Sequence, residues 1–251
     1  MCTLILAWRV FDDAPVVVAA NRDEYRDRPS RPPGVYSEEP LVIAPRDAKA
    51  GGTWIGFNEH GLFAGITNRW NDVDLAGERS RGLLVADVLE RESVREAVQT
   101  VERSTAENEY AGFNLVVADD SEAVWLGWDG ELARTDFEPG VHVVVNVAVD
   151  DRVEIPASRT ELGAEQAENA RAVRDALAPE PDEGIEPWLD RTRSVLGDHE
   201  YGVCLHENGF GTTSSSLIVL GDDPGYAFAD GPPCRSTYER VDVNVDLEGQ
   251  F

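Results

Sequence analysis

Short runs of apolar residues, separated by turn-forming residues, dominate the first third of the chain. Residues 2–10 and 15–21 flank Asp12 and Asp13, so we expect these two runs to pair as a β-hairpin. Three more short strands are predicted at residues 41–44, 53–57 and 62–68. The stretch between the two groups contains Pro29, Pro32, Pro33 and Gly34, and this composition predicts irregular structure.

Helical periodicity follows in two places. Residues 81–91 carry apolar positions on one face, and Ser93 and Glu96 form a capping-box pattern that opens a second helix. A further capping box, Ser158 with Glu161, predicts a helix reaching about residue 177, and residues 185–196 predict a shorter one. The remaining apolar runs predict strands at residues 113–118, 123–128, 141–147, 201–206, 214–220 and 226–229.

The order of these elements indicates the fold class. Blocks of strands alternate with blocks of helices, whereas a doubly wound parallel sheet would alternate single strands with single helices. We therefore expect an α+β fold with two largely antiparallel sheets covered by helix pairs. No repeat of fixed period and no low-complexity linker interrupts the 251 residues, so residues 1–251 are predicted to form one domain.

The composition excludes several function classes. With 48 acidic and 22 basic residues the net charge is −26, and such a field repels nucleic acid and anionic lipid surfaces. Of the 22 cations only Lys49 is a lysine; this acid-rich, lysine-poor chemistry is typical of a halophilic protein in a high-salt cytoplasm. No apolar stretch reaches 18 residues, so no membrane insertion is expected. The predicted partner is a small molecule.

The cysteines predict a reduced, cytoplasmic protein. Cys2, Cys204 and Cys234 are odd in number and show no disulfide framework, and the N-terminus lacks a basic leader. Cys204 and His206 would lie on one face of a strand, but the other ligand types are scattered without metal-site spacing: Cys234, His199, His60 and His142. A buried thiol near a solvated histidine explains the pair better, so no metal or other cofactor is expected.

Cys2 is the strongest candidate for chemistry. Removal of Met1 would give this residue both a thiol and a free α-amine, which are a nucleophile and a general base held together by covalent geometry. The alternative is an ordinary small residue in an edge strand. Asn21-Arg22-Asp23-Glu24 follows the second strand, and the predicted hairpin returns it beside Cys2, where Asp23 would orient the amine and Arg22 would lower the thiol pKa. The alternative is a polar end to a strand.

Five segments in order resemble one protein family. They are Met1-Cys2-Thr3, Asn21-Arg22-Asp23-Glu24, the Arg46-Asp47 to Gly51-Gly52-Thr53-Trp54-Ile55-Gly56 segment, Ile66-Thr67-Asn68-Arg69 and Gly112-Phe113-Asn114-Leu115. Together these segments resemble the NRDE family, also called the Transport and Golgi organisation family. The resemblance implies an N-terminal-nucleophile hydrolase-like fold, a four-layer αββα sandwich.

The same resemblance implies kinship to choloylglycine-hydrolase-type amidases. It assigns Cys2 as nucleophile, Asp23 as a supporting group, and Asn146, after an apolar strand, as the oxyanion donor; in the amidase hypothesis Arg22 joins Asp23 as an orienting group. It also marks Asn21, Trp54, Asn68 and Asn114 as substrate-binding candidates.

Two positions depart from the family patterns: Ala20 stands where the amidases have Arg, and Thr213 where NRDE proteins often have Arg. Two hypotheses therefore follow: a cysteine amidase acting on a small amide, or a non-catalytic protein handling haem or a lipid or acyl-CoA ligand.

Overall fold

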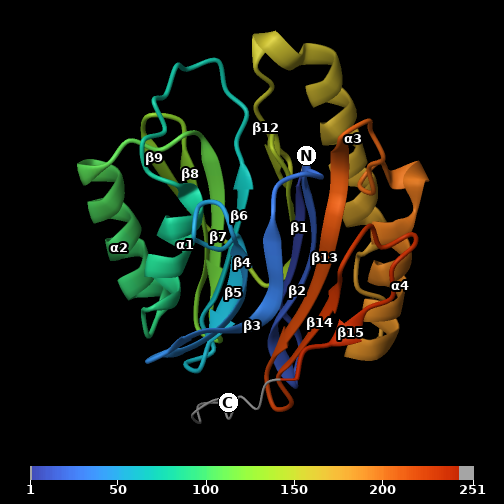
Figure 1. Cartoon of the computed structure of the whole chain (residues 1–251). Coiled ribbons are helices and arrows are strands. Elements are labelled where there is room, and N and C mark those ends of the chain that lie inside the picture. Colours follow the sequence, from blue (N-terminus) through green and yellow to red (C-terminus); the bar gives the residue numbers. More distant parts are fainter. Residues whose placement is uncertain (1, 243–251) are drawn as a thin grey trace. The chain divides into compact units, whose positions relative to one another are not determined.

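The computed structural model describes residues 2–242, and the chain forms two compact units (Figure 1). The first unit contains the N-terminal chain up to Asp27 together with Pro139–Arg240, and the second contains Arg28–Glu138. Each unit is built on one antiparallel sheet and one pair of α-helices. The predicted α+β class is confirmed. The prediction of a single domain stays a prediction.

The sheet of the first unit has eight strands in the order β12-β11-β10-β1-β2-β13-β14-β15. Its strands are β1 Thr3–Phe11, β2 Ala14–Tyr25, β10 Gly140–Val144, β11 Ala148–Val149, β12 Arg152–Val153, β13 Phe210–Leu220, β14 Gly225–Ala229 and β15 Glu239–Arg240. The predicted N-terminal hairpin is confirmed, because β1 pairs antiparallel with β2. β1 is also hydrogen-bonded to β10, so it lies between β2, which follows it directly, and β10, which comes more than 120 residues later in the sequence.

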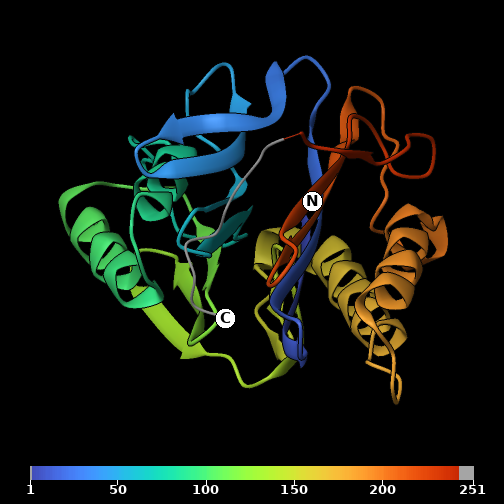
Figure 2. The same cartoon turned by 90° about the horizontal axis from the view of Figure 1, so that it is seen from below.

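Helices α3 (Thr160–Ala176) and α4 (Ile185–Gly197) lie on one face of this sheet, as Figures 1 and 2 both show. Trp188 on α4 is fully buried and contacts the ring of Phe11 in an edge-to-face arrangement at 5.7 Å. Its indole N–H donates to the carbonyl of Leu177, so the one polar atom of this core side chain is satisfied. The apolar stripes of the two helices thus close the core of the first unit.

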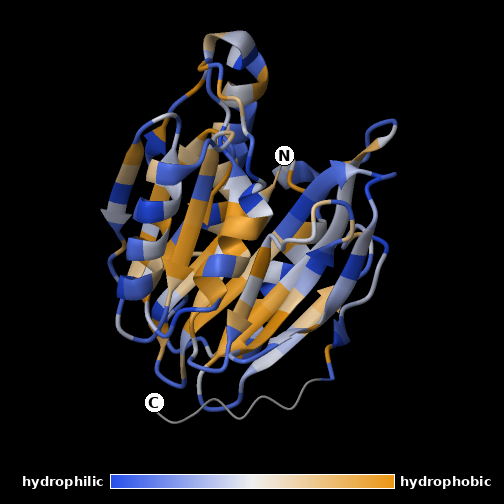
Figure 3. Cartoon of the chain, turned by 60° about the vertical axis from the view of Figure 1, so that its left-hand side comes forward, coloured by the Kyte–Doolittle hydropathy of each residue, from blue (hydrophilic) through white to orange (hydrophobic). Residues whose placement is uncertain are grey.

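The sheet of the second unit has seven strands in the order β3-β4-β5-β6-β7-β8-β9. Its strands are β3 Ser30–Glu38, β4 Leu41–Asp47, β5 Ile55–Asn58, β6 Phe63–Asn68, β7 Phe113–Ala118, β8 Ala123–Trp128 and β9 Leu132–Asp136. Helices α1 (Arg81–Leu89) and α2 (Val94–Glu107) share one hydrophobic core with it. In Figure 3 hydrophobic residues (orange) gather on the strands in the middle of the picture, whereas the helices alternate hydrophobic and hydrophilic residues, as amphipathic elements do. No helix within residues 2–242 combines the length and apolarity needed to cross a bilayer.

The expectation of irregular structure around Pro29–Gly34 is wrong, because β3 runs from Ser30 to Glu38. β3 is an edge strand, paired only with β4, so prolines lacking an N–H can face away from the partner. The register shifts between Arg31 and Gly34, which accommodates Pro32 and Pro33 in an irregular part of the ladder.

Two further local predictions are wrong. Residues 201–206 do not form a strand: a 3-10 turn, His199–Tyr201, ends at Gly202 in the left-handed conformation, and only His206 makes a bridge, to Gly211. Ser158 does not cap α3, because residues 157–159 form a 3-10 turn that leads directly into the helix without a side-chain cap. Ser93 does cap α2, since its hydroxyl accepts from Glu96 N–H.

Candidate functional site

The sheet register of the first unit explains how the N-terminal cysteine meets residues far away in sequence. Since β1 pairs with β2 and β10, the chain start lies beside the C-terminal ends of both neighbours. Cys2 is half-buried immediately before β1. Its Sγ lies 3.7 Å from the Asp23 carbonyl oxygen, and its backbone nitrogen donates to Oδ1 of Asn146 at 3.3 Å. Both reactive atoms of Cys2 therefore have partners among the predicted site residues.

The Asn146 side chain is held in one orientation. Asn146 is 1% exposed and follows β10, and Gln166 of α3 donates Nε2–H to the same Oδ1 at 2.9 Å. Two donors on one oxygen fix which end of the amide faces Cys2. The nitrogen of Cys2, not its sulfur, is thus what Oδ1 of Asn146 contacts.

Asp23 provides a buried carboxyl group beside Cys2. It is 6% exposed, and its Oδ1 accepts a 2.5 Å hydrogen bond from the Thr212 hydroxyl of β13. Burial raises the pKa of Asp23 from 3.8 to about 6; the Thr212 hydrogen bond opposes this rise, and the negative charge of Glu207 adds to it. The group therefore changes protonation close to neutral pH.

The Cys2 thiol is not activated by its surroundings alone. Burial raises the pKa of this thiol, the Asp23 carboxylate raises it further, and Arg22 opposes both. A thiolate at this position needs a local proton acceptor, and the residue's own α-amine would be one.

Arg22 reaches the position where the family pattern has a cation. Its guanidinium donates Nη1–H to the Thr213 hydroxyl at 3.1 Å and lies 3.8 Å from Glu24. Thr213 sits at a register shift of β13, between the residues paired with Asp23 and Arg22. Arg22 is 8% exposed, so its guanidinium lies in a largely buried place next to Thr213.

Asn21 connects elements of the first unit. It is 1% exposed, and its Nδ2 donates to the carbonyl oxygens of Leu196 and Val203. Its donors tie β2 to the end of α4 and to the loop that follows. The contacts are those of a fold-stabilising amide, and its substrate-binding role stays a prediction.

Three predicted substrate-binding residues belong to the second unit. Asn114 in β7 is buried; it donates to the Thr67 hydroxyl and accepts from the indole N–H of Trp125. Asn68 is exposed at the end of β6, and Trp54 is half-buried just before β5. Their substrate-binding roles stay predictions.

Sequence reasoning missed Thr212 and Gln166, which position Asp23 and Asn146. Thr212 lies in Gly211-Thr212-Thr213-Ser214, where Thr213 departs from the family's Arg, and that departure was the available signal. Gln166 carries no signal, because one glutamine on a helix predicts no partner 20 residues away.

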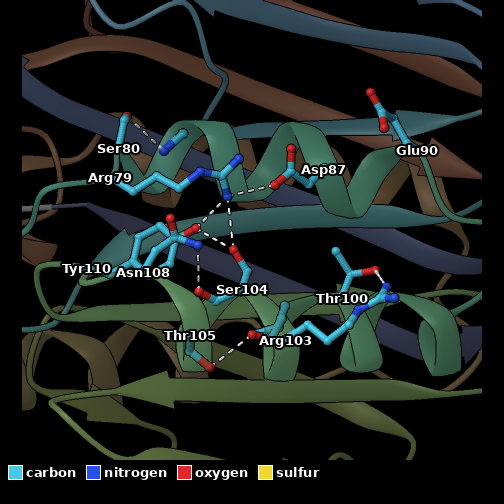
Figure 4. A network of polar contacts seen from close by, with 12 residues as sticks. Arg79, Ser80, Asp87, Glu90, Thr100, Arg103, Ser104, Thr105, Asn108 and Tyr110 are labelled. Carbon is cyan, nitrogen blue, oxygen red and sulfur yellow. Dashed lines mark hydrogen bonds and ion pairs between the residues drawn. The ribbon is translucent and has the colours of Figure 1, made fainter.

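The second unit has a cavity of about 800 Å³ beside α1 and α2. Arg79 stands at its wall, bound to Asp87 at 2.7 Å, Tyr110 at 2.6 Å and Ser104 at 3.0 Å (Figure 4). No cysteine or histidine is among the described residues that line it. The cavity thus offers an anchored cation and no thiol or imidazole nucleophile.

Comparison with protein families decides the kinship of the chain. The family profile "Transport and Golgi organisation 2" matches residues 1–229. The chain belongs to this family. Transport and Golgi organization protein 2 homologs from Bos taurus and Homo sapiens are 28% and 26% identical to it, each alignment covering 88% of this chain and 90% of the relative.

Solved structures show the fold of this Transport and Golgi organisation 2 family member. Penicillin V acylase from Agrobacterium tumefaciens matches 91% of this chain and 83% of its own, with a TM-score of 0.57 and 16% identity. The Caenorhabditis elegans ortholog of N-acylethanolamine-hydrolyzing acid amidase matches 87% and 92%, with a TM-score of 0.58 and 14% identity. The C2A mutant of conjugated bile acid hydrolase from Clostridium perfringens matches 100% of this chain and 99% of its own, with a TM-score of 0.56 and 12% identity. The predicted N-terminal-nucleophile hydrolase-like fold is confirmed.

Proposed function

We propose that this protein is a cysteine amidase of the N-terminal-nucleophile type that hydrolyses a small acyl amide. The observation that carries the proposal is the environment of Cys2: its nitrogen is held by Asn146 at 3.3 Å and its sulfur lies beside Asp23. The nucleophile and the nitrogen that would become its base are thus both fixed in one site.

The reaction needs Met1 to be removed, which converts the backbone nitrogen of Cys2 into an α-amine. That amine takes the thiol proton, and the thiolate attacks the carbonyl carbon of the substrate. The protonated amine then gives its proton to the departing amine of the substrate, leaving a thioester on Cys2. Water, deprotonated by the same α-amine, hydrolyses the thioester and regenerates the thiol.

Asn146 and Asp23 have separate parts in this proposal. Oδ1 of Asn146 orients the α-amine, and Nδ2 of the same side chain is the donor that would stabilise the oxyanion of the tetrahedral intermediate. Asp23 stabilises the ammonium form of the amine, and its pKa of about 6 leaves it mainly ionised at neutral pH. Arg22, whose guanidinium donates to Thr213, favours the thiolate form of Cys2.

The comparisons support the reaction class. An acylase and an acid amidase share the fold, and these names denote hydrolysis of acyl amides. The third structure carries a C2A substitution, at the residue number that the nucleophile has here. We further propose that the protein works in the cytoplasm on a small molecule. Adaptation to high salt, which the acidic composition indicates, stays a prediction.

The test is hydrolysis of a panel of N-acyl amides that differ in acyl chain, with release of a fluorescent amine as the readout. Wild-type protein should show turnover, Cys2→Ala should lose at least about 10³-fold in kcat/KM, and His60→Ala, an exposed residue of the second unit, should match the wild type. Equal activity of Cys2→Ala and wild type would refute the proposal. Ligand-dependent thermal stabilisation that persists in Cys2→Ala, without turnover of any amide, would favour the ligand-handling alternative.

A further inference from the structure

Four side chains with metal-binding atoms meet in the first unit, beside the candidate active site. They are His199, Cys204, His206 and Cys234, and their ligand atoms all lie within 4.8 Å of one another. The spacing along the sequence predicted scattered residues, and for these four that prediction is wrong. His60 and His142 lie outside the cluster; His142 is bonded to Asp150 at 2.7 Å.

The distances within the cluster approach those of a tetrahedral site. Nε2 of His206 lies 3.7 Å from Sγ of Cys204 and 3.1 Å from Sγ of Cys234. Zinc bound tetrahedrally with its usual bond lengths to sulfur and nitrogen separates S and N ligand atoms by about 3.6 Å, and two S atoms by about 3.8 Å. Shifts of side chains by roughly an ångström would therefore suffice to close the four atoms around one ion.

The backbone prepares this arrangement. Cys204 and His206 are two residues apart in an irregular segment, and their side chains lie together in the cluster. The segment is fixed to β13, because Thr212 N–H donates to the Leu205 carbonyl and Leu205 N–H donates to the Thr212 hydroxyl. His199 comes from the preceding 3-10 turn, and Cys234 from a turn in which Ser236 N–H donates to Pro232.

The ring geometry also suits a shared ion. The imidazoles of His199 and His206 have centroids 5.0 Å apart and are tilted by 59°, so they converge without stacking. Cys204 is buried at 4% exposure and His199 is exposed, which places the cluster at the surface with one sulfur on the protein side.

We propose that His199, Cys204, His206 and Cys234 bind one zinc ion in a closed structural site with two cysteine and two histidine ligands. Two thiolates and two neutral imidazoles fill all four tetrahedral positions, which leaves none for water or substrate. The two thiol protons go to solvent when the ion binds, so the two resulting thiolates, the two neutral imidazoles and Zn²⁺ form a centre with no net charge.

The site has a defined consequence for the neighbouring residues. Leu205 lies between two of the ligands, and its N–H donates a hydrogen bond to the Thr212 hydroxyl. The Thr212 hydroxyl in turn donates to the carboxylate of Asp23. The ion would hold this segment against β13 and so keep the Thr212 hydroxyl directed at Asp23. The zinc is therefore a stabilising ion of the first unit, and its binding does not depend on whether the protein is an amidase.

The test uses full-length protein, produced without a histidine tag, kept reduced and dialysed against a weak chelator before zinc is measured by mass spectrometry. Wild-type protein should retain about one zinc per chain. Cys234→Ser and His206→Ala should each fall below roughly a tenth of that, whereas His60→Ala and Cys2→Ser should match the wild type. Circular dichroism of each variant shows whether it is folded.

Cobalt substitution provides a second readout that does not depend on the stability of a variant. Wild-type protein reconstituted with Co²⁺ should show thiolate-to-cobalt charge transfer and the intense ligand-field bands of tetrahedral cobalt. Absence of zinc from reduced wild-type protein together with absence of these bands would overturn the proposal. So would zinc that is bound equally by wild type, Cys234→Ser and His206→Ala, or a Cys204–Cys234 disulfide in the native protein.

Discussion

The buried carboxyl group of Asp23 should leave a measurable mark on the pH dependence of stability. Its pKa is raised by burial from 3.8 to about 6, so ionisation is less favourable in the folded chain than in the unfolded one. The folded state consequently gains stability from the protonated group at low pH. This stabilisation is fully present below the unfolded pKa and is lost as pH rises through about 6.

The size of the effect follows from the shift. Two pKa units correspond to about 3 kcal/mol of unfolding free energy between roughly pH 4 and pH 8. Asp23→Asn removes the ionisable group while an amide oxygen still accepts the Thr212 hydroxyl. Relative to wild type, the variant should therefore become more stable as pH rises, by up to about 3 kcal/mol.

The assay is urea unfolding of both proteins at several pH values and constant ionic strength, with the difference in unfolding free energy plotted against pH. Asp47→Asn is the matched control with the opposite sign. Burial alone would raise the pKa of Asp47, but hydrogen bonds from Ala50, Arg28 and Lys49 lower it overall, so its stabilisation exists above the unfolded pKa and is lost as pH falls through the folded pKa. A pH-independent difference between wild type and Asp23→Asn would refute the reasoning.

Three other changes test separate parts of the structure. Gln166→Met removes one hydrogen-bond donor to Asn146 and also a side-chain carbonyl oxygen that has no partner among the described residues. The free energy of unfolding in urea should therefore change by less than about 1 kcal/mol. In the amidase assay kcat should fall about tenfold, with KM little changed. Asn58→Ala should lower the unfolding free energy by about 3–5 kcal/mol, because this fully buried amide makes four hydrogen bonds, two donated to carbonyls of Leu89 and Arg91 and two accepted from backbone N–H groups. Gly52→Ala should lower the thermal midpoint by more than about 10 °C, because the new methyl carbon, in the loop between β4 and β5, would lie 2.2 Å from the Gly82 backbone of α1.

The sequence indicated the hairpin and the helices because their signals are local. Apolar runs predicted β1, β2, β7 and β8, helical periodicity predicted α1 and α2, and α3 was expected from a capping-box pattern. β3 was missed because prolines normally interrupt strands, and only its position at the sheet edge makes them tolerable. Edge position is a property of the sheet as a whole, which local patterns do not encode.

The candidate site divides in the same way. Cys2 and Asp23 were found because the hairpin returns one beside the other, and this is a short-range consequence of β1 and β2. Thr212 and Gln166 were missed because their partners lie 189 and 20 residues away, and the pairing depends on sheet order and on how α3 packs. The cluster of His199, Cys204, His206 and Cys234 was missed for the same reason: its ligands come from two turns and an irregular segment that only the folded chain brings together.

The central claim is that Cys2 carries a free amine and a thiol at the true start of the chain. The most direct measurement combines the intact mass of natively expressed protein with labelling by 2-cyanobenzothiazole, which condenses only with a residue that has both groups. Under denaturing, reducing conditions the account predicts a mass without Met1 and one condensation adduct per chain, mapped to Cys2. A protein that retains Met1 and forms no adduct when fully unfolded would contradict it.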